Sequence, residues 1–98
     1  MPYVSITKSD KANKKLKAVF TRHNGTKKTI HFGSAGMDDY TITKDKEQRK
    51  RYLDRHRKNE SWNNPETAGA LSRHILWGSS TSRRDNIKAF KKRFGYKN

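Results

Sequence analysis

The stretch Trp62–Gly78, WNNPETAGALSRHILWG, decides how this 98-residue chain is organised, because it is apolar and almost free of charge. It contains one base, Arg73, and one acid, Glu66. The whole chain holds 24 lysines and arginines against 9 acids, a formal net charge of +15, so the excess positive charge lies in the flanking segments. We therefore interpret this stretch as the central scaffold and expect function on its basic flanks.

The pattern within this stretch predicts a helix over residues 64–77. Asn64 is expected to be its N-cap, and Pro65 its first residue, where the missing N–H costs nothing. Gly78 is expected to end the helix as the C′ residue. The apolar positions on one side of this helix are Ala68, Leu71, Ile75 and Leu76. Such a helix should be buried between a sheet and neighbouring helices.

The N-terminal residues 1–33 show the alternating pattern of a three-stranded antiparallel sheet. Strands are predicted at residues 3–7, 15–22 and 27–33, because apolar and polar side chains alternate in each. The polar residues 8–15 connect the first two strands and should be exposed to solvent. This connection could be a phosphate-contacting loop or a solvated linker, and the sequence leaves both open.

The sequence between the second and third strands predicts a hairpin. A two-residue turn would place the apolar residues of the two strands on opposite faces of the sheet. We therefore predict a three-residue loop, His23–Gly25, with its glycine left-handed in a bulge. This register places Ala18 opposite Ile30 and Leu16 opposite Phe32.

Two further helices are predicted on either side of the central one. The first covers residues 43–59 with Thr43 as N-cap, and the other covers residues 82–94 with Ser82 as N-cap. Gly95 is expected to end the last helix. The order β-β-β-α-α-α indicates an α+β fold, in which the sheet packs against three C-terminal helices in one domain of residues 1–98.

The strongly basic composition, with a sequence pI of about 10.4, predicts a polyanionic partner. Nucleic acid is the expected partner, because each phosphate neutralised by lysine or arginine releases condensed counterions. No asparagine, glutamine or arginine arrangement marks an element that reads bases. The cations expected to contact phosphates are Lys8, Lys11, Lys14, Lys15, Lys44, Lys50, Arg51, Arg55, Lys58, Arg83, Arg84, Lys88, Lys91 and Lys92.

The sequence offers little for catalysis, and we expect no cofactor and no metal site. Without cysteine the chain has neither disulfides nor a thiolate zinc site. Asp38 and Asp39 are adjacent, so their side chains need not converge on one metal, and an Asx turn is the preferred interpretation. No apolar run approaches a membrane span and no signal-peptide core is present, so we expect neither membrane association nor secretion.

The two tryptophans, Trp62 and Trp77, bracket the central stretch. Either could stack on an unpaired base. Packing is the preferred interpretation, because a chain this poor in aliphatic residues needs both indoles to fill its core.

Several motifs make residues 31–95 similar to a family of small basic proteins encoded by large nucleocytoplasmic DNA viruses and some protists. They are HFG at 31–33, DYT at 39–41, RYLDRH at 51–56, WNNPETAG at 62–69 and ILWG at 75–78. The resemblance implies a role associated with a viral genome, in the virion or in the host nucleus or viral factory. It offers no catalytic residues, because no activity is attached to the family.

Together these patterns predict a non-enzymatic protein that binds nucleic acid, DNA more than RNA, through phosphate contacts and with little sequence preference. Binding to RNA or to single strands is the first alternative. Two other classes also stay open. One is a metal-dependent nuclease that uses Asp38 and Asp39, and the other is an adaptor for acidic protein partners.

Overall fold

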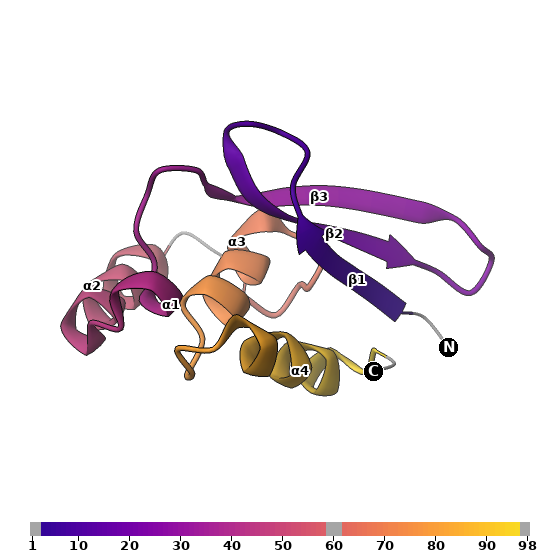
Figure 1. Ribbon diagram of the computed structural model, residues 1–98. Helices are drawn as coiled ribbons and strands as arrows, with labels where there is room; N and C mark the ends of the chain where they lie inside the picture. The colour runs from indigo at the N-terminus through magenta and orange to yellow at the C-terminus, as the bar shows by residue number, and fades with distance from the viewer. Residues whose placement is uncertain (1–2, 59–61, 97–98) are drawn as a thin grey trace.

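The computed structural model describes residues 3–58 and 62–96 (Figure 1). Three antiparallel strands are followed by helices, so the predicted α+β class is confirmed. The elements are β1 Tyr3–Lys8, β2 Lys14–Thr21, β3 Lys27–Ser34, α1 Tyr40–Thr43, α2 Lys46–His56, α3 Ala68–Leu71, the π-helical segment η1 Ser72–Leu76, and α4 Arg83–Phe94. The helices lie on one side of the sheet (Figure 1).

The sheet has the order β1-β2-β3, and its hairpin register is the predicted one. Ala18 pairs with Ile30 and Leu16 with Phe32. The N–H of Arg22 donates to the carbonyl of Thr26 over 3.0 Å, which leaves a loop of three residues between them, and the third, Gly25, has a φ of +85°. Its N–H donates to the carbonyl of Arg22 over 3.0 Å, which closes the turn. The period of two therefore excludes a shift by one residue, which would turn the polar side chains towards the core.

The core lies between the sheet and the central helical stretch. The largest of its fully buried apolar side chains are Phe20, Phe32, Phe90, Leu71, Ile75 and Leu76. Trp77 closes one end of the core by stacking on Tyr52, with ring centroids 4.2 Å apart and planes 5° apart. The interpretation of Trp62–Gly78 as a buried scaffold is thus correct for the apolar residues of α3 and η1.

The start predicted for the central helix is wrong. The helix begins at Ala68, and Thr67 is its N-cap, because the Thr67 side chain accepts a hydrogen bond from the N–H of Ala70. Asn64 instead accepts from the N–H of Glu66 over 3.1 Å, which forms an Asx turn. An asparagine side chain is equally well satisfied in an N-cap and in such a turn, so the local sequence does not distinguish the two.

The end predicted for this helix is confirmed, because Trp77 is the C-cap of η1 and Gly78 follows it as the C′ residue. The last turn is a π-helix, in which the N–H of Trp77 donates to the carbonyl of Ser72 over 3.0 Å. Gly78 does not have a left-handed backbone. Packing requires a glycine at position 78, because a Cβ there would clash with the carbonyl of His74 and lie 2.6 Å from Cγ of Asn86 in α4.

The helix predicted over residues 43–59 is divided in two. Asp39 caps α1 and Asp45 caps α2, and between them Lys44 has a left-handed backbone with a φ of 58°. Thr43 is therefore the last residue of α1 and not an N-cap. The predicted last residue, Asn59, lies outside the described residues.

The predictions for the last helix are confirmed at both ends. The Ser82 side chain accepts from the N–H of Asp85 over 3.2 Å, and Gly95 ends α4 with a φ of 76°.

Candidate nucleic-acid interface

A buried carboxylate, Asp39, organises the basic surface next to β2. It is 1% exposed, and its Oδ2 atom accepts from Nζ of Lys15 over 2.6 Å and from Nη2 of Arg83 over 3.3 Å. Its Oδ1 atom accepts from the N–H and the hydroxyl of Thr41. Burial alone would raise the pKa of Asp39, but the hydrogen bonds and the charges of Lys15 and Arg83 outweigh burial and lower the pKa. The ionised carboxylate thus ties together β2, α1 and the start of α4.

Five of the predicted cations meet around one hollow of about 590 Å³ beside this ion pair. We call it the lysine hollow, and its cations are Lys8, Lys11, Lys14, Lys15 and Arg83. The described residues that line it include one acid, Asp10, whose side chain is 76% exposed. The hollow therefore gathers cations from β1, β2, their connection and α4.

Backbone hydrogen bonds shape the connection that contributes to this hollow. Strands β1 and β2 extend further than predicted, so only residues 9–13 connect them. The N–H of Ser9 donates to the carbonyl of Lys15 over 3.1 Å, and the N–H of Ala35 donates to the carbonyl of Asn13 over 3.0 Å. The Ser9 hydroxyl also lies 2.7 Å from Nδ1 of His31. These contacts hold the lysines at a defined edge of the sheet.

The other predicted cations are placed apart from the lysine hollow. Arg55 lines a second hollow, of about 320 Å³, together with Lys14 and Lys15. Of the cations that line neither hollow, Lys44, Lys50, Arg51, Lys58, Arg84, Lys88 and Lys92 are exposed, and Lys91 is half-buried. They extend along α2 and α4, so the structure brings together only some of the predicted set.

Lys15 and Arg83 also have a structural role that was not predicted. Both were expected to contact phosphates, yet each is bound to the buried carboxylate of Asp39. The Lys15 side chain is 12% exposed and that of Arg83 is 36% exposed. Their remaining capacity for a ligand is therefore smaller than that of Lys8 and Lys11, which are exposed.

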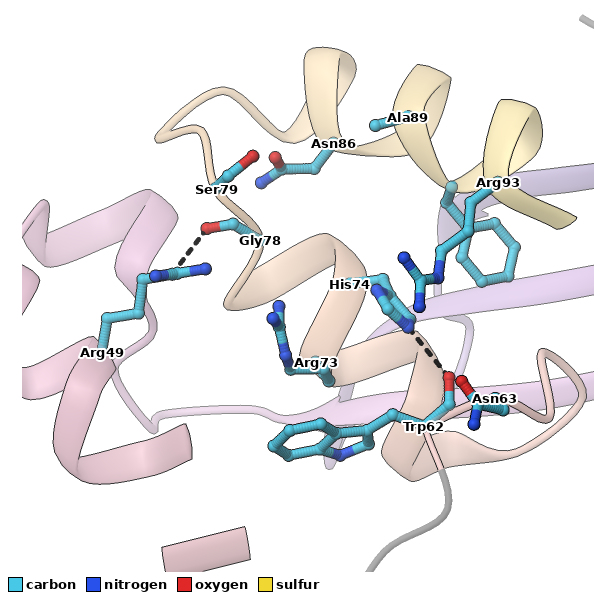
Figure 2. A pocket seen from close by; sticks show the side chains of 11 residues that line it. Arg49, Trp62, Asn63, Arg73, His74, Gly78, Ser79, Asn86, Ala89 and Arg93 are labelled. Carbon is cyan, nitrogen blue, oxygen red and sulfur yellow. Dashed lines mark hydrogen bonds between the residues drawn. The ribbon is translucent and has the colours of Figure 1, made fainter. Parts of the chain in front are cut away.

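A second basic site was missed by the sequence reasoning. Arg49 from α2, Arg73 from η1 and Arg93 from α4 line a pocket of about 490 Å³ with His74 (Figure 2). We call it the arginine pocket. None of the described residues that line it is acidic.

Two of these arginines are fixed by a shared backbone carbonyl. The carbonyl of Trp77 accepts from Nε of Arg49 over 3.1 Å and from Nη1 of Arg73 over 3.2 Å. Nε of Arg49 also donates to the carbonyl of Gly78 over 2.9 Å. The Arg73 guanidinium lies over the Trp62 ring, 5.1 Å from its centroid. These contacts hold two positive charges close together at the end of η1.

The pKa values of Arg73 and His74 in this pocket are both lowered. Burial lowers the pKa of Arg73, and the charges of Arg49 and Arg93 lower it further. Burial also lowers the pKa of His74, with smaller contributions from the charges of Arg73 and Arg93, although a hydrogen bond to the carbonyl of Trp62 acts in the opposite direction. Both bases are therefore disfavoured in their charged form, first by burial and then by the neighbouring arginines.

One signal in the sequence could have indicated this pocket. Arg73 has no acid three or four residues away on either side, where an ion-pair partner would lie in a helix. A base inside an apolar helix without such a partner must find one elsewhere in the fold or bind an anion.

Asp38 and Asp39 do not form a visible metal site. Asp38 is exposed. The carboxylate of Asp39 already accepts four hydrogen bonds, from Lys15, Thr41 and Arg83. Within residues 3–58 and 62–96, no group of three histidines or acids is placed to hold a metal ion. The helices formed by these residues are all too short or too polar to cross a membrane.

Comparison with known proteins gives a family without an assigned activity. The model of a family of unknown function, DUF5754, matches residues 4–56, which include the sheet, α1 and α2. The uncharacterized protein L851 of Acanthamoeba polyphaga mimivirus is 34% identical over 83 residues, which cover 79% of this chain and 83% of the relative. No solved structure matches the chain.

Proposed function

Given that the chain belongs to the DUF5754 family and is similar to a mimivirus protein, we propose that it is a non-enzymatic nucleic-acid-binding protein. It holds double-stranded DNA through phosphate contacts and with little sequence preference. The lysine hollow is the main contact surface, and exposed cations of α2 and α4 add to it.

The observation that carries this proposal is the meeting of Lys8, Lys11 and Lys14 with Arg83 around one hollow. Arg83 is distant in sequence from the three lysines, yet the fold places it beside them around a hollow with one exposed acid. A concave surface of one charge raises the local potential and attracts polyanions. Lysine is well suited to phosphate contacts that carry no sequence information, because its ammonium group acts as a point charge.

Double-stranded DNA is the proposed form because it presents phosphates at high density, with about one negative charge per 1.7 Å of helix axis. The relative in a mimivirus supports a role with a viral genome. We propose that the protein acts in the virion or at the viral factory or host nucleus, where such a genome is packaged or copied.

A competition experiment tests the form of nucleic acid. Labelled duplex DNA bound to the protein is challenged with unlabelled duplex DNA, single-stranded DNA and RNA of equal length, and the bound fraction is measured by gel shift. Duplex DNA is expected to compete best. Stronger competition by RNA or by single strands would replace the proposal with the corresponding alternative, and failure of all three to bind at low salt would favour an acidic protein partner.

The same samples test for nuclease activity. After long incubation with magnesium or manganese, intact DNA is expected. Cleavage that is lost in the Asp38→Ala variant would contradict the non-enzymatic part of the proposal. Asp38 is the informative position because it is exposed, whereas Asp39 has a structural role.

A further inference from the structure

We propose that the arginine pocket binds a phosphate monoester, the group found at a 5′ strand end and in free nucleotides. The site lies between α2, η1 and α4 and is lined by Arg49, Arg73 and Arg93. It shares no lining residue with the lysine hollow. The inference therefore goes beyond the proposed function and does not depend on it.

The geometry places unused donors of three guanidinium groups around one space. Figure 2 shows Arg49 and Arg73 approaching each other below Gly78, while Arg93 extends from α4 towards His74. Arg49 uses its Nε for backbone carbonyls, and within the described residues its two Nη atoms donate to no other group. Arg93 makes no hydrogen bond or ion pair with the described residues. Its guanidinium lies 5.7 Å from the centroid of the Phe94 ring. The outward-facing donors are available for a ligand.

Among the described residues, no acidic side chain lines the pocket to act as a counter-ion. Nε of Arg73 is buried and has no hydrogen-bond partner among the described residues. Arg73 is half-buried, and among the described residues its guanidinium makes one hydrogen bond, to the carbonyl of Trp77, and no ion pair. A cation that is partly removed from water is stabilised by an opposite charge. A bound anion would supply the missing charge to Arg73 and to its two neighbours together.

Stabilisation of the carbonyls at the end of η1 explains only part of this group of three arginines. Cations stabilise the carbonyls at a helix C-terminus, and Arg49 and Arg73 do so through Trp77. One cation is enough for that role. A second guanidinium on the same carbonyl, and a third from α4, add repulsion that the helix end does not offset.

Phosphate monoester is the anion that fits these donors. It carries a charge of about −1.5 to −2 at pH 7 and three strong acceptor oxygens, and a guanidinium binds two of these oxygens at once. A phosphodiester within a strand carries one charge and is flanked by a sugar on each side, so it would neutralise the pocket less well. Asn63 and Ser79 at the rim add polar side chains (Figure 2).

The test measures binding of inorganic phosphate to the whole protein by calorimetry, with chloride at equal ionic strength as the reference. One phosphate per chain is expected to bind, and the Arg93→Gln variant should weaken binding by at least about tenfold, since it removes charge-assisted hydrogen bonds. Arg93 is exposed and makes no hydrogen bond to the described fold, so this variant should stay folded. The matched control is Arg84→Gln, which changes the same charge on α4 outside the pocket. Phosphate that binds no better than chloride, or equal weakening by both variants, overturns the proposal.

Two further ligands identify the source of the phosphate. A single-stranded oligonucleotide is compared with and without its 5′-phosphate, and a free nucleoside monophosphate is titrated alone. Arg93-dependent tightening by the 5′-phosphate assigns the site to strand ends, whereas tight nucleotide binding without such tightening assigns it to free nucleotides. If neither ligand binds through Arg93, the proposal is wrong.

This outcome is separable from that of the proposed function. Duplex DNA with unphosphorylated ends should still bind to the lysine hollow of the Arg93→Gln variant. Loss of duplex binding in a variant with both Lys8→Gln and Lys11→Gln, with phosphate binding retained, would show two independent sites.

Discussion

Nζ of Lys15 in β2 lies 2.6 Å from the buried carboxylate of Asp39, which caps α1. This ion pair joins the sheet to the helical layer at the edge of the lysine hollow. It also explains why two adjacent aspartates, which invite a metal-site interpretation, have different roles. Asp39 holds the fold together, and Asp38 is exposed.

Replacing Asp39 by asparagine should destabilise the protein. The variant removes the charge that compensates Lys15 and Arg83, and we expect a loss of about 2–3 kcal/mol in the free energy of unfolding, as for hydrogen bonds to charged groups. Urea denaturation measures this change. The matched control is Asp38→Asn, which should change stability little. Equal effects of the two variants would contradict the assigned roles.

The lowered pKa of His74 predicts a loss of stability in mild acid. The unfolded chain gains a proton near the ordinary pKa of 6.5, whereas in the folded protein burial and the charges of Arg73 and Arg93 disfavour that proton. Because the unfolded state binds more protons, the free energy of unfolding should fall as the pH drops below 6.5, until the folded pKa is reached.

Urea denaturation between pH 7.5 and 5 checks this sign. A His74→Gln variant should lose part of the decrease, and the matched control is His23→Gln in the exposed hairpin loop. A decrease that is the same in wild type and in His74→Gln would show that another group is responsible.

The lowered pKa of Asp39 predicts a second loss of stability, at a lower pH than that of His74. Its folded pKa lies below the ordinary value of 3.8, so its contribution is present above that value and is lost as the pH falls through the folded pKa. Acid unfolding of the Asp39→Asn variant, followed by circular dichroism, should lack this contribution. An unchanged acid transition would contradict the ion pair.

Gly78→Ala should destabilise the protein through packing. The added methyl group would meet the Asn86 side chain and the carbonyl of His74, and overpacking of this kind costs about 1–3 kcal/mol. Thermal unfolding measures the loss, and Ser79→Ala at the neighbouring exposed position is the control. A stabilised Gly78→Ala variant would mean that α4 can move away from η1 at little cost.

Trp77→Ala should abolish binding only by unfolding the protein. The variant removes a buried indole that stacks on Tyr52, and such truncations cost about 3–5 kcal/mol. Trp77→Phe keeps an aromatic ring and should keep both the fold and the affinity for DNA. Loss of affinity in a folded Trp77→Phe protein would indicate that the indole itself contacts the ligand.

The sheet was predictable because burial leaves one register for strands with a period of two. Helix boundaries were less predictable, since Asn64 and Thr67, like Thr43 and Asp45, are all good local caps. In the structure Thr67 and Asp45 are the caps, and the side chain of each accepts a backbone N–H of the first turn that follows it.

The lysine hollow could be predicted in part, since four of its five cations lie within residues 8–15. The role of Lys15 and Arg83 as partners of Asp39 required the packing of β2 against α1 and α4. The arginine pocket depends even more on packing. Its three arginines come from three helices, and the sequence places Arg49 on a packing face and Arg73 in a segment of zero net charge.

The most direct test of the central claim is the salt dependence of duplex DNA affinity. The logarithm of the affinity should fall linearly with the logarithm of the salt concentration, with a slope of about 0.9 for each phosphate contact. Replacing Lys8, Lys11 and Lys14 together by glutamine should reduce the slope by about 0.9 for each contact removed. A control that replaces Arg22, Lys27 and Lys28, which are exposed on the β2–β3 hairpin and lie outside the proposed surface, changes the net charge equally. A lower slope in the lysine variant alone is the predicted result, whereas a salt-insensitive affinity or equal slopes in the two variants would contradict the lysine hollow as the DNA-binding surface.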